Sequence, residues 1–136
     1  YTSFAYSSLQ VTPEAPCGGN IQIRFHVKNT GAAAGDEVAQ IYWHDCQGTL
    51  VRPMRQLGAF VRLTLQPGEE RTVQVVLDSH QLAYHGADMQ LSIQLGRREV
   101  MVGSSSADIR LEGSFTLTGP RLVVERRTFH PQITLF

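Results

Sequence analysis

The stretch VKNTGAAAGDEVAQIYW, residues 27–43, carries the pattern that decides the fold. Residues 21–28, which overlap its start, alternate apolar and polar side chains, as in a strand with one face in a core and one in water. The Asn-Thr-Gly at residues 29–31 favours a turn that ends this strand. Residues 37–44 have few polar interruptions, so we expect a strand with both faces covered. The stretch therefore predicts two strands joined by a plain connecting loop.

The two-residue period recurs through most of the chain. Strands are expected over six further segments, namely residues 4–12, 56–65, 72–77, 90–94, 98–102 and 109–117. The fourth and fifth of these could be one strand interrupted at Gly96. Gly58 and Gly113 mark expected bulges, and Asp78 or Ser79 is expected to cap one helical turn. Seven or eight short strands, with turns about every 8 to 12 residues, predict an all-β, immunoglobulin-like antiparallel sandwich.

Composition narrows the choice of partners. The chain has 136 residues, a single-domain length, with 12 Lys plus Arg against 12 Asp plus Glu. This balance provides no basic field for phosphate backbones and argues against nucleic acid. No apolar run approaches the roughly 20 residues of a membrane span, which argues against a membrane partner. The start at Tyr1, already strand-like and without Met, suggests a piece of a longer polypeptide with any targeting signal upstream.

The end of the chain reads differently from the rest. Residues 120–136, PRLVVERRTFHPQITLF, contain two apolar clusters separated by charged residues 125–127. Such a segment either docks along the sandwich or packs on a neighbouring domain. We therefore divide the chain into a sandwich over residues 1–119 and a C-terminal tail over residues 120–136.

Several motifs in fixed order point to a family. After residues 27–43 come RPMRQLGAFVRLTLQPGEERTV (52–73), LAYHGADM (82–89) and REVMVGSSSADI (98–109). Over about residues 1–119 the chain resembles the fibronectin type III-like domain at the C-terminal end of family 3 glycoside hydrolases, the β-glucosidase and β-xylosidase group. It departs from the usual pattern at LSIQLGRREV, which lacks an aromatic and a Pro-Gly, and at Cys46, where Pro is common.

The resemblance implies a fibronectin type III-like sandwich that is not itself catalytic and needs no cofactor. In the family, the catalytic carboxylates come from domains upstream. The implied partners are the catalytic domains of the same polypeptide, whose parent would be a retaining enzyme that hydrolyses β-glycosidic bonds. A homo-oligomer is left open, and a secreted or periplasmic location is favoured over a cytoplasmic one.

The acidic residues agree with a non-catalytic chain. Retaining glycoside hydrolysis needs two carboxyl groups about 5 Å apart. The carboxylates here fall at expected turns and strand ends: Asp36, Glu37, Asp45, Glu69, Glu70, Asp78, Asp88 and Glu99. Carboxylates at such places are usually turn caps or solvated groups. We therefore assign no catalytic residue to this chain.

Two other clusters contain residue types that occur at binding sites. Residues 44–46, His-Asp-Cys, could meet His26, but they lack the paired spacing of a structural zinc site, so we expect no metal. Residues 103–106, Gly-Ser-Ser-Ser, have no following helix and no Lys, which favours a hairpin turn over a phosphate cradle.

The two cysteines are a candidate disulfide. In a sandwich of this topology, the loops that carry Cys17 and Cys46 lie at the same end. A bridge would close a loop of about 30 residues and contribute about 3–4 kcal/mol by the chain-entropy estimate. Two free thiols are the alternative.

Aromatic and cationic residues supply the remaining candidates. Candidate sugar contacts are Trp43, Tyr42 and Tyr84, although core packing is the expected role of a Trp in mid-strand. Candidate domain-interface residues are Arg52, Pro53 and Arg55. The favoured function is an accessory domain that packs on and stabilises catalytic domains. The alternatives are a carbohydrate-binding module that uses exposed aromatics and an adhesion or oligomerisation module that uses the tail.

Overall fold

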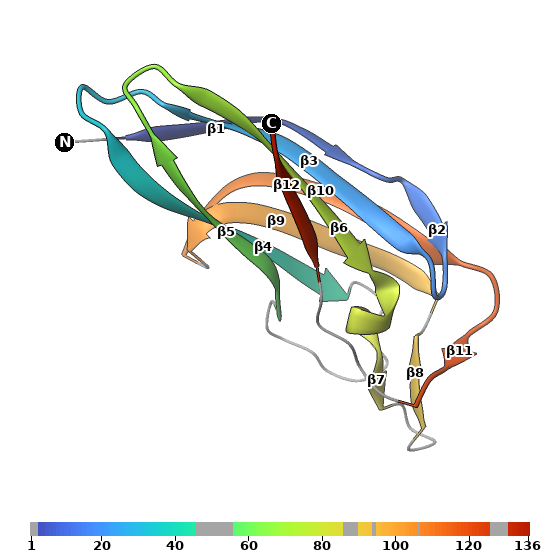
Figure 1. Ribbon diagram of the computed structural model, residues 1–136. Coiled ribbons are helices and arrows are strands. Elements are labelled where there is room, and N and C mark those ends of the chain that lie inside the picture. Colours follow the sequence, from blue (N-terminus) through green and yellow to red (C-terminus); the bar gives the residue numbers. More distant parts are fainter. Residues whose placement is uncertain (1–2, 46–55, 86–89, 94, 106, 126–130) are drawn as a thin grey trace.

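The computed structural model describes residues 3–45, 56–85, 90–93, 95–105, 107–125 and 131–136, and it is an all-β sandwich (Figure 1). One layer is a four-stranded sheet with the order β1 (Phe4–Val11), β3 (Asn20–Asn29), β6 (Glu70–Asp78) and β12 (Gln132–Leu135). The other is a five-stranded sheet with the order β2 (Glu14–Pro16), β10 (Asp108–Thr118), β9 (Gly96–Ser105), β4 (Gly35–Asp45) and β5 (Gln56–Leu65). A small third sheet has the order β11 (Leu122–Val123), β8 (Leu91–Ile93) and β7 (Tyr84–His85). The predicted fold class is confirmed.

The core lies between the two large sheets and follows the alternation in the sequence. In β3 the apolar phase is completely buried, and it faces inward together with the apolar phase of β6. From the five-stranded sheet, Ile41 and Trp43 of β4 and Val100 and Val102 of β9 complete the core. Each fully buried large apolar side chain contributes roughly 1.5–3 kcal/mol relative to an exposed one. The strand period therefore supplies most of the driving force for the fold.

The loop that follows β3 crosses from one sheet to the other. The side chain of Asn29, which is fully buried, holds this crossing. Its Nδ2 donates to the carbonyl oxygens of Ala33 (2.9 Å) and Leu65 (3.0 Å), and its Oδ1 accepts from the amide of Gly31 (2.8 Å). Its backbone carbonyl accepts from the amide of Gly68 (2.9 Å) in the β5–β6 turn. Asn29 thus joins the two inter-sheet connections at one end of the sandwich.

One of the two predicted bulges is confirmed and the other is wrong. Opposite β4, the register passes from Ala59 to Leu57, so Gly58 is the extra residue. A Cβ at Gly58 would lie 3.3 Å from Cδ1 of Trp43, so glycine leaves room for the indole. Gly113 is in regular register with β9, whose irregularities with β10 lie nearer the hairpin. A Cβ at Gly113 would lie 3.1 Å from Cδ2 of Leu9, so this glycine permits close approach of β1 instead.

The expected count of seven or eight strands was too low. The two large sheets already contain nine strands among the described residues, and the third sheet adds three. Several of the additional strands have only two or three residues, which is too short for a period to be read. The segments 90–94 and 98–102 are not one strand, because β8 and β9 belong to different sheets. The predicted helical turn is present as the 3₁₀ helix η1 (Ser79–Leu82), capped by Asp78.

The tail forms two of these short strands. β11 pairs with β8, and β12 pairs antiparallel with β6 at the edge of the four-stranded sheet. Phe136 extends this pairing, since its amide donates to the carbonyl oxygen of Thr72 (2.9 Å). The division of the chain at residue 119 stays a prediction. Within the described residues, no helix is long and apolar enough to cross a membrane.

Candidate functional site

Several carboxylates of the described chain are held by neighbouring donors. Asp36 accepts hydrogen bonds from Arg62 (2.6 Å) and from the Thr64 hydroxyl (2.7 Å), and these bonds lower its pKa. Burial raises the pKa of Asp78, but hydrogen bonds from the backbone and ring of His80 outweigh it, so the pKa is lowered overall. A general acid needs the opposite shift, a raised pKa. These carboxyl groups stay ionised at neutral pH and act as structural acceptors.

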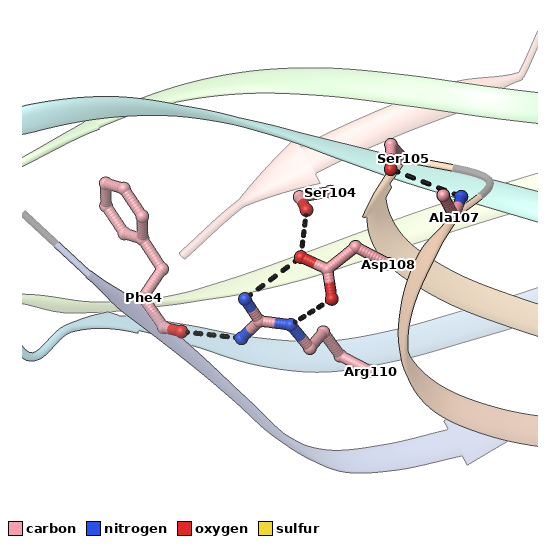
Figure 2. Close-up of polar contacts among 6 residues, drawn as sticks. All are labelled: Phe4, Ser104, Ser105, Ala107, Asp108 and Arg110. Carbon is pink, nitrogen blue, oxygen red and sulfur yellow. Dashed lines mark hydrogen bonds and ion pairs between the residues drawn. The ribbon is translucent and has the colours of Figure 1, made fainter.

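The most connected polar cluster joins the β9–β10 hairpin to β1 (Figure 2). Arg110 Nε donates to Asp108 Oδ1 (2.8 Å), and its Nη2 donates to Asp108 Oδ2 (3.1 Å). Its Nη1 donates to the carbonyl oxygen of Phe4 (2.9 Å). The Ser104 hydroxyl donates to Asp108 Oδ2 (2.6 Å), and the amide of Ala107 donates to the Ser105 hydroxyl (3.2 Å). Residues 103–105 thus belong to a hairpin, as predicted, and Ser106 lies outside the described residues. Hydrogen bonds from Arg110 and Ser104 lower the pKa of Asp108 to about 2.

Tyr6 lies beside this cluster and is not arranged for catalysis. The Arg110 guanidinium carbon lies 5.7 Å from the centre of its ring, and the ring stacks on Phe25 at 6.1 Å between centroids. Burial, and secondarily the charge of Glu37, raise the pKa of the Tyr6 hydroxyl. A phenol with a raised pKa stays neutral and is a poor nucleophile or base. The cluster therefore ties the start of β1 to the opposite sheet.

The candidate disulfide is only half described. Cys17 follows β2 and is half-buried, whereas Cys46 lies outside the described residues. Burial raises the pKa of Cys17, and the nearby charge of Arg98 partly opposes this effect. The thiolate is disfavoured, so a redox or nucleophilic role for Cys17 finds no support here. The Cys17–Cys46 bridge stays a prediction.

The three candidate sugar contacts occupy different environments. Trp43 is 2 % exposed and belongs to the core between the sheets. Tyr42 points to the outer face of the five-stranded sheet, where its hydroxyl donates to Oε1 of Gln40. Tyr84 pairs through its backbone with Ser92 in the small sheet, and its side chain lies outside the described part. The candidate interface residues Arg52, Pro53 and Arg55 also lie outside it.

The histidines considered as metal ligands lie in different layers. His26 is in the four-stranded sheet, where its Nδ1 is 2.9 Å from the Thr72 hydroxyl, while His44 is in the five-stranded sheet. Residues 45 and 46 have no described side chains. Across the described ranges, no group of three His, Cys, Asp or Glu side chains is placed to hold a metal ion.

The outer side of the five-stranded sheet carries an apolar surface that we call the apolar face. It consists of Val38 and Tyr42 of β4, Leu57 and Phe60 of β5, and Met101 of β9. Tyr42 lies directly between Leu57 and Met101. Phe60 lies opposite Gln40, which precedes Tyr42 on the same outward side of β4. Phe60 is 56 % exposed, Leu57 39 % and Val38 36 %.

The sequence signal for this face was present but was assigned another meaning. Phe60 is out of phase with Val61, Leu63 and Leu65, and the expected bulge at Gly58 also accounts for this break. We also expected both faces of residues 37–44 to be covered. The inner side of β4 is covered, but Val38 on its outer side is exposed within the described chain.

Comparisons with known proteins agree with the fold. A family model described as a fibronectin type III-like domain matches residues 37–106. The chain belongs to the fibronectin type III-like domain family. Over 135 residues it is 31 % identical to the thermostable β-glucosidase B of Acetivibrio thermocellus, covering 98 % of this chain and 18 % of that protein. Over 118 residues it is 33 % identical to the periplasmic β-glucosidase of Salmonella typhimurium, covering 86 % of this chain and 15 % of that protein.

A solved structure extends this agreement. The β-glucosidase 3B of Thermotoga neapolitana, in complex with α-D-glucose, superposes with a TM-score of 0.80 at 32 % identity, covering 91 % of this chain and 17 % of that one. The fibronectin type III-like chain therefore spans less than a fifth of the length of these relatives. The resemblance to the C-terminal domain of family 3 glycoside hydrolases is confirmed.

Proposed function

We propose that the chain is a non-catalytic accessory domain that packs on and stabilises the catalytic domains of a β-glucosidase-like glycoside hydrolase. The observation that carries this proposal is the match of nearly the whole chain to less than a fifth of several β-glucosidases. The chemistry of that reaction would then belong to the rest of the polypeptide. The lowered pKa values of Asp36, Asp78 and Asp108 are consistent with this division of labour.

Deleting residues 1–136 from the parent polypeptide tests the stabilising role. We expect the truncated parent to lose hydrolysis of an aryl β-glucoside at a lower temperature than the intact protein, because the surface that the domain covers becomes exposed. The isolated chain should give no hydrolysis above a buffer blank. An unchanged inactivation temperature, or turnover by the purified chain, would refute the proposal.

One observation favours a second candidate, a carbohydrate-binding module. The exposed ring of Phe60 lies near Tyr42 on a sheet surface, and aromatic rings can stack on the apolar faces of sugars. Affinity electrophoresis on soluble glucans tests this alternative. Retardation that disappears in Phe60→Ala would support carbohydrate binding, and unretarded migration would reject it.

A further inference from the structure

We propose that the apolar face docks on the catalytic part of the parent polypeptide, with Phe60 as its central anchor. This inference rests on the proposed accessory function and adds which surface makes the contact. The face is continuous, because Leu57, Tyr42 and Met101 form one row across three strands. Phe60 and Val38 continue it along β5 and β4. Two adjacent strands, β4 and β5, thus present exposed apolar side chains on the outside of the sandwich, and the buried Met101 extends the row to β9.

The surroundings of the face have the anatomy of an interface. Gln40 and Tyr42 bond to each other at its centre, and Arg62 bonds to Asp36 at its border with a distance of 2.6 Å between nitrogen and oxygen. Protein interfaces commonly combine an apolar centre with a polar rim, and aromatic and Met side chains are enriched at their centres. The polar groups next to Phe60 are therefore already partnered, and a docking surface gains chiefly by covering the ring.

The outward side of β3, in the opposite sheet, has a different composition. Outward side chains of β3 are polar, and two of them meet polar side chains of β6: Gln22 Nε2 donates to Gln74 Oε1 at 3.1 Å, and His26 Nδ1 lies 2.9 Å from the Thr72 hydroxyl. Phe136 at that edge has the guanidinium carbon of Arg24 5.2 Å from its ring centre. No such cation is recorded over Phe60 among the described residues. The outward side of β3 is therefore suited to face water, whereas the edge of the same sheet exposes the apolar side chains of Ile133, Leu135 and Phe136.

The size of the face and the length of the relatives favour a partner in the same polypeptide. The chain covers only 13–18 % of the relatives' length, so more than four fifths of a β-glucosidase parent lies outside it. Because Met101 is buried, the other four side chains offer only a few hundred Å² of exposed apolar surface, below the roughly 800 Å² per partner of a standard free complex. A covalent link supplies a millimolar effective concentration, so a smaller contact suffices. We therefore assign the face to an apolar surface of the catalytic domains.

The test uses the full parent polypeptide and two matched substitutions. Phe60→Ser and Phe136→Ser remove rings of equal exposure, 56 % and 55 %, from opposite sheets. We expect Phe60→Ser to raise the population of undocked domain roughly tenfold, as for an interface anchor. It should speed amide exchange in β5 and lower the temperature at which activity is lost. Phe136→Ser should leave both measurements near wild type. Thermal unfolding of the isolated chain should shift little in either variant.

The possible results separate the two proposals. Equal effects of the two substitutions, in a parent that deletion of the domain still destabilises, would overturn the docking face and leave the accessory function standing. No effect of deletion would overturn both. If sedimentation shows that Phe60→Ser instead abolishes a dimer, the face joins two copies and the proposal is wrong. Loss of retardation on glucans, with unchanged stability of the parent, would likewise overturn it in favour of a sugar site.

Discussion

The outward side of β3 and the outward side of β4 and β5 are built on the same strand period but carry opposite chemistry. In β3 the outward phase is Gln22, Arg24, His26 and Lys28, all polar. On β4 and β5 the outward phase includes exposed Val38, Leu57 and Phe60. A strand with one face in a core needs only a polar face toward water. An apolar outward phase therefore identifies the sheet that is expected to meet something else.

The largest expected effect separates buried from exposed aromatic rings. Phe25 is completely buried in the core, whereas Phe60 is more than half exposed. We expect Phe25→Ala to lower the free energy of unfolding of the isolated chain by about 3–5 kcal/mol, because it leaves a cavity between the sheets. Phe60→Ala should lower it by less than about 1 kcal/mol. Urea denaturation measures both. Similar losses would mean that Phe60 belongs to the fold and not to a docking face.

Asn29 should be the next most sensitive position, because it links the ends of both sheets. Asn29→Ala would remove the buried hydrogen bond to the carbonyl oxygen of Leu65 and the partly buried one to that of Ala33. We expect a loss of about 2–3 kcal/mol in urea unfolding. Thr30→Ala, one residue further on at an exposed position, is the control and should cost well under half of that. A loss at Asn29 no larger than the control would show that the crossing is held elsewhere.

The difference between the two faces marks what the sequence could predict. Alternation placed the strands of the core, and the Asn-Thr-Gly turn placed the end of β3, because both are local signals. The contacts of Asn29 with Leu65 and Glu69 depend on chain segments that meet only after folding, and no local pattern encodes them. The apolar face was missed for the same reason, since it combines three strands whose order in the sheet follows from topology.

A smaller effect should appear at the end of the sandwich where β1 is tied to the five-stranded sheet. Because the folded pKa of Asp108 is about 2, below its unfolded value of about 3.9, ionisation of Asp108 favours the folded state. This contribution is fully present above about pH 4 and is lost as the pH falls toward 2. Asp108→Asn should therefore flatten the decline of stability between about pH 4 and pH 2 in urea denaturation. An identical pH profile in this variant and the wild type would contradict the assignment.

The smallest effect should come from the polar outward side of β3. It sharpens the contrast between Phe136 and Phe60. Arg24 lies over the Phe136 ring, so Arg24→Met should lower the unfolding free energy of the isolated chain by about 0.5–1 kcal/mol at low salt. Lys28→Met, on the same outward phase of β3, is the matched control and should change stability by less than about 0.5 kcal/mol. In the full parent, Arg24→Met should leave the temperature of activity loss unchanged, because the polar outward side of β3 faces water. The outcome that contradicts this is a parent that loses activity at a lower temperature with Arg24→Met than with Phe60→Ser. The four-stranded sheet would then carry the domain contact, and the assignment of the two faces must be exchanged.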